Sequence, residues 1–106
     1  MKHFMAIHRF HNDEARKAYC SAQGEPGTQK DWIAFGNTTH DHVKCRQEWV
    51  GDDLAFCHWE AESAEAVHAW LDELGVGELI STELFEQWRF TSFYNPTDDL
   101  RQYKEF

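Results

Sequence analysis

The stretch of residues 43–74 constrains the fold most strongly, because it reads in order as a strand, a tight turn, a strand and a helix. Two runs rich in apolar and aromatic residues, 43–50 and 54–61, flank Gly51-Asp52-Asp53, a sequence typical of a hairpin turn. In the predicted helix over 64–74, which Ser63 caps and Gly75 and Gly77 end, apolar residues recur at the i, i+3, i+4 and i+7 spacing of one helix face. The stretch therefore predicts a β-hairpin followed by an amphipathic helix.

The flanking sequence adds two strands and a second helix. Strands are predicted over 3–10 and 79–90, and Asn12 stands where it can cap a helix over 13–23. The segment 28–42 is open to two interpretations, because its DWIAF sequence fits either a short strand or an apolar loop folded over a pocket. The predicted order of elements is β-α-β-β-α-β.

This order predicts a ferredoxin-like α+β plait. Right-handed crossovers bring the four strands into one antiparallel sheet with two helices on one face. The 106 residues suit one such domain, expected over 1–90, with a C-terminal tail over 91–106 that docks on its own or a partner subunit through four aromatic residues. The other face of the sheet is bare, and aromatic residues there need cover. We therefore expect a homodimer of the dimeric α/β-barrel type.

The balance of charge limits the partners. Ten Lys and Arg against 19 Asp and Glu give a formal charge of −9, which repels nucleic acids and anionic membrane surfaces. No window approaches the roughly 18 apolar residues of a spanning helix, and the start lacks the apolar core of a signal peptide. Three cysteines without CxxC spacing fit reduced thiols. We expect a cytoplasmic protein that binds neither nucleic acid nor membrane.

A three-residue turn in the hairpin assigns side chains to the two faces of the sheet. The expected cross-strand pairs are Val50–Leu54, Gln47–Cys57 and Cys45–Trp59. The mostly apolar face, expected to pack under the helices, carries Val43, Cys45, Gln47, Trp49, Ala55, Cys57 and Trp59. The other face carries Lys44, Arg46, Glu48, Phe56, His58 and Glu60.

The first strand offers two choices of buried face. The alternatives are Phe4, Ala6, His8 and Phe10, or His3, Met5, Ile7 and Arg9. Met5 and Ile7 suit a core, which favours the second set. That choice predicts His8 on the bare face beside His58, because the first and third strands are neighbours in this fold.

His40, His42 and Cys45 form the first candidate site. In an extended segment the two histidines point to the same side, about 7 Å apart at Cα, and can converge on one ion. Nickel and zinc accept such nitrogen and sulfur ligands. Cys45 has the opposite parity, so it joins them only if the strand begins after His42. The alternative is two solvated loop histidines and a buried thiol.

His58 is the second candidate. On the bare face it is flanked by Glu60 and, across the hairpin, by Arg46. An imidazole held by a carboxylate can act as a general base or as a metal ligand. The alternative is a polar patch at a dimer interface, held by an ion pair.

The centre of the chain also carries a family-like motif. It comprises an aromatic-Val pair, an acidic turn and two following segments: Trp49-Val50, Asp52-Asp53, Phe56-Cys57-x-Trp59-Glu60-Ala61 and Ser63-x-Glu65-Ala66-Val67. This motif resembles small bacterial ferredoxin-like proteins, largely uncharacterised, with which nickel binding has been associated. Their second strand typically carries a His where this chain has Gln47, and Cys57 is the potential ligand at a matching position. The resemblance implies the fold and a dimeric α/β barrel, a group in which several members bind or oxidise small ligands.

Two classes of function follow. The first is a dimeric binding protein for a divalent transition metal, nickel or zinc, or for a small ligand, with His40, His42, Cys45 and His58 as metal ligands. The second is a cofactor-independent dimeric α/β-barrel monooxygenase or isomerase, in which His58 and Glu60 act as base and Arg46 binds an anionic small molecule. A structural or regulatory module without a ligand is a third reading. Because no GxSxG, P-loop, GxGxxG or HExxH motif is present, the sequence leaves open whether the protein is an enzyme.

Overall fold

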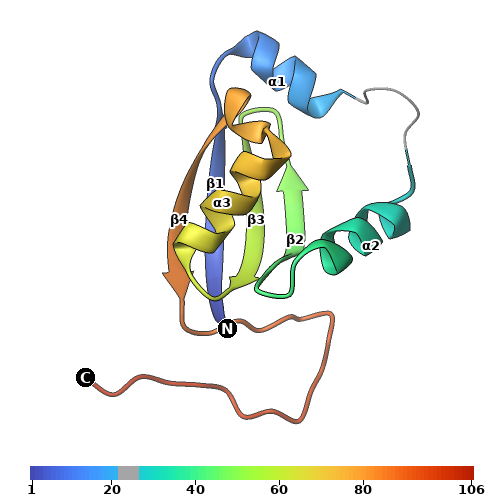
Figure 1. Cartoon of the computed structure of the whole chain (residues 1–106). Helices are drawn as coiled ribbons and strands as arrows, with labels where there is room; N and C mark the ends of the chain where they lie inside the picture. Colours follow the sequence, from blue (N-terminus) through green and yellow to red (C-terminus); the bar gives the residue numbers. More distant parts are fainter. Residues whose placement is uncertain (22–26) are drawn as a thin grey trace.

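The computed structural model describes residues 1–21 and 27–106, which form one antiparallel sheet and three α-helices (Figure 1). The elements are β1 (Lys2–Phe10), α1 (Asp13–Cys20), α2 (Gln29–Thr39), β2 (Val43–Val50), β3 (Leu54–Ala61), α3 (Ala64–Leu74), a 3-10 turn (Val76–Glu78) and β4 (Ile80–Gln87). The strand order is β2-β3-β1-β4, and every neighbouring pair is antiparallel. The predicted α+β class and four-stranded antiparallel sheet are confirmed, and the order is compatible with a ferredoxin-like plait.

Local signals in the sequence account for the ends of α1 and α3. The Asn12 side chain accepts a hydrogen bond from the backbone N–H of Ala15 at 2.8 Å, and Ser63 accepts one from Ala66 at 3.1 Å. Gly75 ends α3 in the left-handed conformation, with φ of 74°, which a glycine adopts without strain. The predicted caps are therefore confirmed. The helix predicted over 13–23 ends at Cys20, and its last two positions lie outside the described residues.

The segment predicted as a strand or apolar loop within 28–42 is instead helix α2. A capping box starts it: the Thr28 hydroxyl accepts from the Asp31 N–H at 3.1 Å, and the Asp31 carboxylate accepts from the Thr28 N–H at 3.4 Å. This helix is additional to the two predicted, and Figure 1 shows it beside β2, toward the end of the sheet opposite α1. The aromatic residues of DWIAF resemble those of a strand, but the T-x-x-D capping box at Thr28 and Asp31 starts a helix.

The choice of buried face on β1 is also corrected. Phe4, Ala6 and His8 are buried under the helices, whereas Met5 and Ile7 are half-buried on the bare face. His8 is tolerated in the core because its Nδ1 lies 2.7 Å from the hydroxyl of Thr82 on β4. His8 and His58 therefore lie on opposite faces of the sheet.

The hairpin register departs from the prediction at a β-bulge. The pair Cys45–Trp59 is confirmed, but the register shifts by one residue between Cys45 and Gln47. The pairs that follow are Gln47–His58, Glu48–Cys57, Trp49–Phe56 and Val50–Ala55, which replace the predicted Gln47–Cys57 and Val50–Leu54. Paired residues share a face, so Glu48 joins Cys57 on the helix face. Gln47 and Trp49 move to the bare face.

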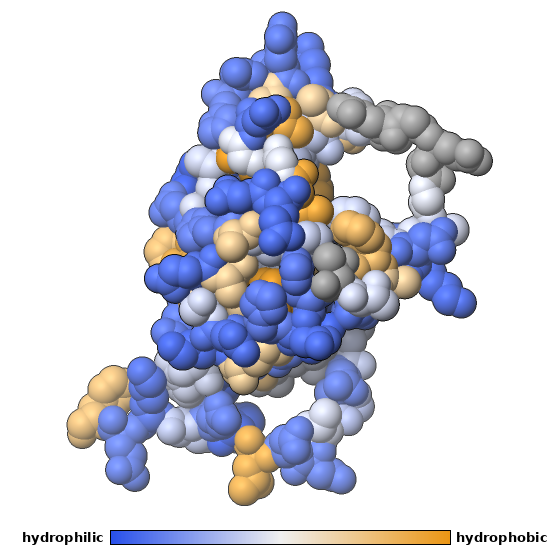
Figure 2. All heavy atoms as spheres, in the orientation of Figure 1, coloured by the Kyte–Doolittle hydropathy of each residue, from blue (hydrophilic) through white to orange (hydrophobic). Residues whose placement is uncertain are grey.

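The core lies between the sheet and α3. Its buried members are Phe4, Ala6, Val43, Cys57, Trp59, Ala61, Val67, Trp70 and Leu71. Figure 2 shows hydrophilic residues over most of the molecular face that carries α3, with apolar patches between them. None of the described helices is long and apolar enough to cross a membrane.

The strand predicted over 79–90 is shorter, since β4 ends at Gln87, and the chain beyond it has no helix or strand. Phe90 packs over His58, with ring centroids 4.3 Å apart. Farther on, Phe93 and Tyr94 are 97% and 98% exposed. Docking of the tail on its own or a partner subunit stays a prediction.

Burial of two histidines predicts a pH-dependent stability. Desolvation lowers the pKa of His8 and, as the largest cause, that of His58. Between those lowered values and the ordinary value of about 6.5, the unfolded chain binds more protons than the folded chain. The free energy of unfolding is therefore expected to fall as the pH drops below about 6.5.

Urea unfolding followed by circular dichroism across this pH range measures the effect. The variant His8→Gln is expected to show a smaller pH slope than the native chain. His68→Gln, at an exposed position on α3, controls for the loss of one histidine. Equal slopes for native protein and His8→Gln would contradict the assignment to His8.

Candidate functional site

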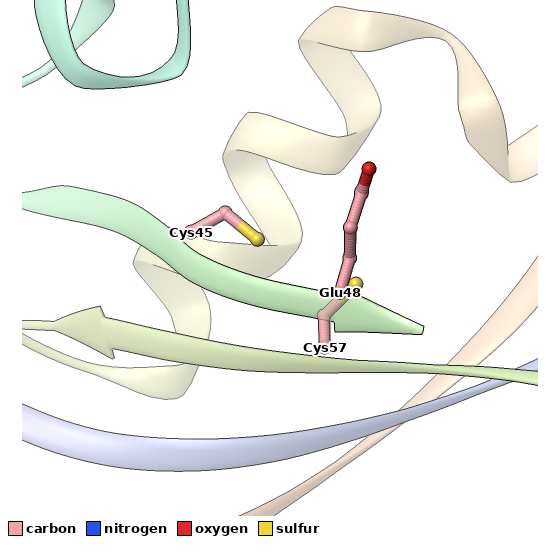
Figure 3. A group of neighbouring side chains, drawn as sticks. All are labelled: Cys45, Glu48 and Cys57. Atoms are coloured by element: carbon pink, nitrogen blue, oxygen red, sulfur yellow. The ribbon is translucent and has the colours of Figure 1, made fainter. Parts of the chain in front are cut away.

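Two thiols and a carboxylate converge on the helix face of the sheet (Figure 3). The ligand atoms of Cys45, Glu48 and Cys57 all lie within 4.8 Å of one another. Cys45 and Glu48 come from β2, on either side of the bulge, and Cys57 comes from β3. In the part of the chain that the structure describes, this is the group of three His, Cys, Asp or Glu side chains that can hold one metal ion.

The bulge is the reason that Glu48 belongs to this group. In a regular strand Cys45 and Glu48, three residues apart, point to opposite faces. The extra residue at Arg46 reverses the alternation, so both side chains reach the same face. The prediction placed Cys45 and Cys57 on one face but put Glu48 on the other.

The three side chains of this group differ in how deeply they are buried. Cys57 is buried in the floor of the sheet, Cys45 is half-buried and Glu48 is exposed at the rim. The hydrogen bond with Cys45, then burial and the nearby charges of Cys45 and Glu48, raise the pKa of the Cys57 thiol. The Cys45 thiol itself donates to the backbone carbonyl of Gln47 at 3.5 Å. A bound cation would reverse this preference of Cys57 for its protonated form, because metal ligands must be deprotonated.

Helices α1 and α2 each bring an aromatic side chain to this group. The Trp32 indole N–H on α2 donates to the Glu48 carboxylate at 3.1 Å. Burial, followed by the charges of Cys57, Glu48 and Cys45, raises the pKa of the Tyr19 hydroxyl on α1. Both side chains therefore belong to the surroundings of the cysteines, although no pattern in the sequence marks either as a neighbour of Cys45 or Cys57.

His40 and His42 lie together at the entrance to β2, with ring centroids 5.1 Å apart. His40 Nε2 lies 3.1 Å from the Glu73 carboxylate on α3, and the ring meets Trp70 edge-on at 4.7 Å. Cys45 lies instead with Glu48 and Cys57. Metal binding by His40, His42 and Cys45 as one set stays a prediction.

A polar chain runs across the bare face of the sheet to His58. Arg46 donates to the Glu60 carboxylate from Nε at 3.0 Å and from a terminal nitrogen at 2.6 Å. Glu60 lies 3.9 Å from His3 Nε2, and His3 Nδ1 lies 2.9 Å from His58 Nε2. The sequence predicted Arg46, Glu60 and His58 together. It missed His3, because the alternation of β1 was read in the opposite phase for His8.

This series of polar side chains ends at the Nδ1 atom of His58. His58 is 6% exposed, and among the described residues its Nδ1 has no hydrogen-bond partner. Burial and then His3 lower the pKa of His58, which keeps the ring neutral, while Arg46 lowers the pKa of Glu60. A neutral imidazole held at one nitrogen is suited to accept a proton or hydrogen bond at the other.

Two groups of reactive side chains thus occupy opposite faces of one sheet. The Cys45–Glu48–Cys57 group lies under the helices, and the series of polar side chains that ends at His58 lies on the bare face. Comparison of the chain with family models, curated proteins and solved structures gives no match. The roles of these residues therefore rest on their geometry and chemistry.

Proposed function

We propose that this protein is a transition-metal-binding protein whose ion is held by Cys45, Glu48 and Cys57. The observation that carries the proposal is the convergence of two thiols and a carboxylate from two strands within 4.8 Å. Such a mixed sulfur and oxygen set suits borderline divalent ions, zinc or nickel. Hard cations such as calcium and magnesium prefer oxygen ligands alone.

The spacing of the three ligand atoms fits an ion after a small contraction. A zinc ion binds thiolates at about 2.3 Å, which places two of them about 3.8 Å apart on a tetrahedron. Side-chain rotation is enough to close the remaining distance, because Cys45 and Glu48 are not fully buried. The ion also offsets the repulsion between two thiolates and a carboxylate.

Metal titration of the untagged full chain tests the proposal. We expect one equivalent of zinc or cobalt per chain, with the absorption of cobalt–thiolate bonds. Cys45→Ser and Cys57→Ser should each weaken binding at least about tenfold, because each removes a direct ligand. Cys20→Ser is the matched control, since Cys20 is the exposed third cysteine.

Two results would count against this centre. Absence of stoichiometric binding would remove the metal function. Binding that survives in both serine variants would move the ion elsewhere, and a His40→Ala, His42→Ala double variant would then test the histidine pair.

We also propose that a second copy of the chain covers the bare face of the sheet. Three aromatic side chains there are substantially exposed, Trp49, Phe56 and Phe85. The arginines of this face are already paired within the chain, as Arg9–Glu83 and Arg46–Glu60. A partner therefore has to cover an apolar surface whose charged side chains are already paired within the chain. The same face of a second copy, related by a twofold axis, offers a matching apolar surface.

A second candidate function is favoured by the orphaned Nδ1 of His58. With Glu60 and His3 behind it, His58 can act as the base of a cofactor-independent monooxygenase or isomerase. An anionic substrate would compete with Glu60 for Arg46. This function needs a ligand-sized space at His58 in the assembled dimer. Histidine ring signals in NMR should then respond to small enolic or phenolic acids, and a partner side chain filling the space would exclude the enzyme.

A further inference from the structure

We infer that the metal ion held by Cys45, Glu48 and Cys57 also binds a small uncharged nitrogen heterocycle, stacked against Trp32. This inference deepens the proposed metal function and rests on it. It assigns the centre to ligand binding, as distinct from a purely structural role. Four features of the described residues support it: the number of ligands, the net charge, the gradient of burial and the aromatic wall.

The number of protein ligands leaves one coordination position. Within the described residues the group contains three donors. Structural zinc sites are closed by four protein ligands, whereas zinc sites that act on ligands have three and keep the fourth for water or substrate. The geometry around Cys45, Glu48 and Cys57 is of the second kind.

Charge selects an uncharged ligand for that position. Two thiolates and one carboxylate carry three negative charges, so a divalent ion leaves the centre with a net charge of about −1. The chain as a whole carries a formal charge of −9, in which Glu48 is already counted. An anion would meet repulsion from both, whereas a neutral nitrogen donor gains the coordination bond without it. Borderline divalent ions accept imidazole-type nitrogen readily.

Burial places the remaining position toward the outside. Cys57 is 4% exposed and forms the floor, while Glu48 is exposed at the rim. Figure 3 shows the Glu48 carboxylate directed away from the strands that carry the two cysteines. A ligand therefore approaches from the side of Glu48.

Trp32 forms an aromatic wall on that side. Its indole N–H donates to Glu48 at 3.1 Å, and its ring stacks on Phe35 with centroids 5.7 Å apart and planes 19° apart. Trp32 also borders a shallow, open depression of about 380 Å³ lined with Gly27, Thr28 and Asp31. A planar ring coordinated beside Glu48 can stack against this pair and extend toward the depression.

The test uses the cobalt-loaded, untagged full chain and adds imidazole or thiocyanate as probes. We expect imidazole to change the visible cobalt spectrum saturably, with one site per ion, and to bind more tightly than the anion thiocyanate. At saturating cobalt, Trp32→Leu should bind imidazole about 2- to 10-fold more weakly than Trp32→Phe through lost stacking, since both variants equally lose the indole N–H bond to Glu48. Trp32→Phe should retain most of the affinity, because it keeps an aromatic ring. Trp88→Leu is the matched control at an exposed tryptophan after β4.

The outcomes separate the two proposals. Failure to bind cobalt overturns the metal function and this inference with it. Cobalt binding with a spectrum that neither probe changes shows a closed centre and overturns this inference alone. Tighter binding of thiocyanate overturns the charge argument, and equal imidazole affinity in Trp32→Leu and Trp32→Phe removes the aromatic wall. Equilibrium dialysis verifies that cobalt stays bound to the protein when imidazole is added. Removal of cobalt from the protein by imidazole would also count against the inference.

Discussion

Replacement of Trp59 with alanine is expected to lower the free energy of unfolding by about 3–5 kcal/mol. Trp59 is 4% exposed and lies on β3, between its cross-strand partners Phe4 on β1 and Cys45 on β2. Truncation removes one of the two tryptophan side chains of the core and leaves a cavity that a rigid sheet cannot collapse. A domain of this size has roughly 5–15 kcal/mol of stability in total, so the loss leaves a substantial unfolded fraction.

Urea unfolding followed by far-ultraviolet circular dichroism measures this loss without relying on tryptophan fluorescence. Trp88→Ala is the matched control, since Trp88 is 48% exposed, and it should change stability by less than about 1 kcal/mol. Trp59→Phe should cost less than Trp59→Ala, because it keeps a ring and removes an indole N–H that lacks a partner among the described residues. A loss below about 1 kcal/mol for Trp59→Ala would mean that the core does not depend on this ring.

Elements with local signals were predictable from the sequence. The hairpin over 43–61 and helix α3 follow from a period of two, a period of 3.6, a Gly-Asp-Asp turn and a serine cap, all within a short stretch. The pair Cys45–Trp59 follows from the same reasoning. Each of these features depends on residues close in sequence.

Features that depend on distant partners were not predictable in the same way. His8 is buried with a hydrogen bond to the side chain of Thr82, which is 74 residues away, and no local sequence pattern indicates this bond. With the phase of β1 misread, His8 was placed beside His58, where His3 lies. A polar side chain can be buried in a core where another group forms a hydrogen bond with it. Such a partner is known only once the strands of the sheet are in place.

The candidate metal centre shows the same limit through one backbone irregularity. Alternation alone places Cys45 and Cys57 on the helix face and Glu48 on the other. The bulge at Arg46 brings Glu48 to the cysteines and moves Trp49 to the bare face. A single inserted residue therefore creates both the third ligand and part of the exposed apolar surface, and neither follows from a regular register.

The bare face supplies the second large expected effect, which concerns assembly. Replacement of Phe85 with aspartate is expected to convert a homodimer to monomers at micromolar concentration. Phe85 is 46% exposed on β4 and pairs with Met5 on β1, within the apolar surface that a second copy is proposed to cover. A carboxylate buried there without a partner costs about 3–5 kcal/mol, a weakening of at least about 100-fold in the dissociation constant.

Analytical ultracentrifugation across a concentration series measures the change, with circular dichroism to show that the variant is folded. Ile33→Asp is the matched control, because Ile33 is 59% exposed on α2 and lies outside the sheet. The native protein should sediment with twice the chain mass, as should Ile33→Asp. A native protein that stays monomeric would contradict the dimer, and a dimeric Phe85→Asp would move the interface to another surface.

The same variant separates assembly from metal binding. Phe85 lies on the bare face, while Cys45, Glu48 and Cys57 lie on the helix face, so the sheet itself separates the proposed interface from the proposed metal centre. Phe85→Asp should therefore keep its metal affinity as a monomer, whereas Cys57→Ser should lose metal affinity as a dimer. His58 lies on the face that the second copy would cover, and the orphaned Nδ1 is the group that assembly would affect. Dissociation by Phe85→Asp should accordingly change the histidine ring signals of His58 and leave those of His8 unchanged.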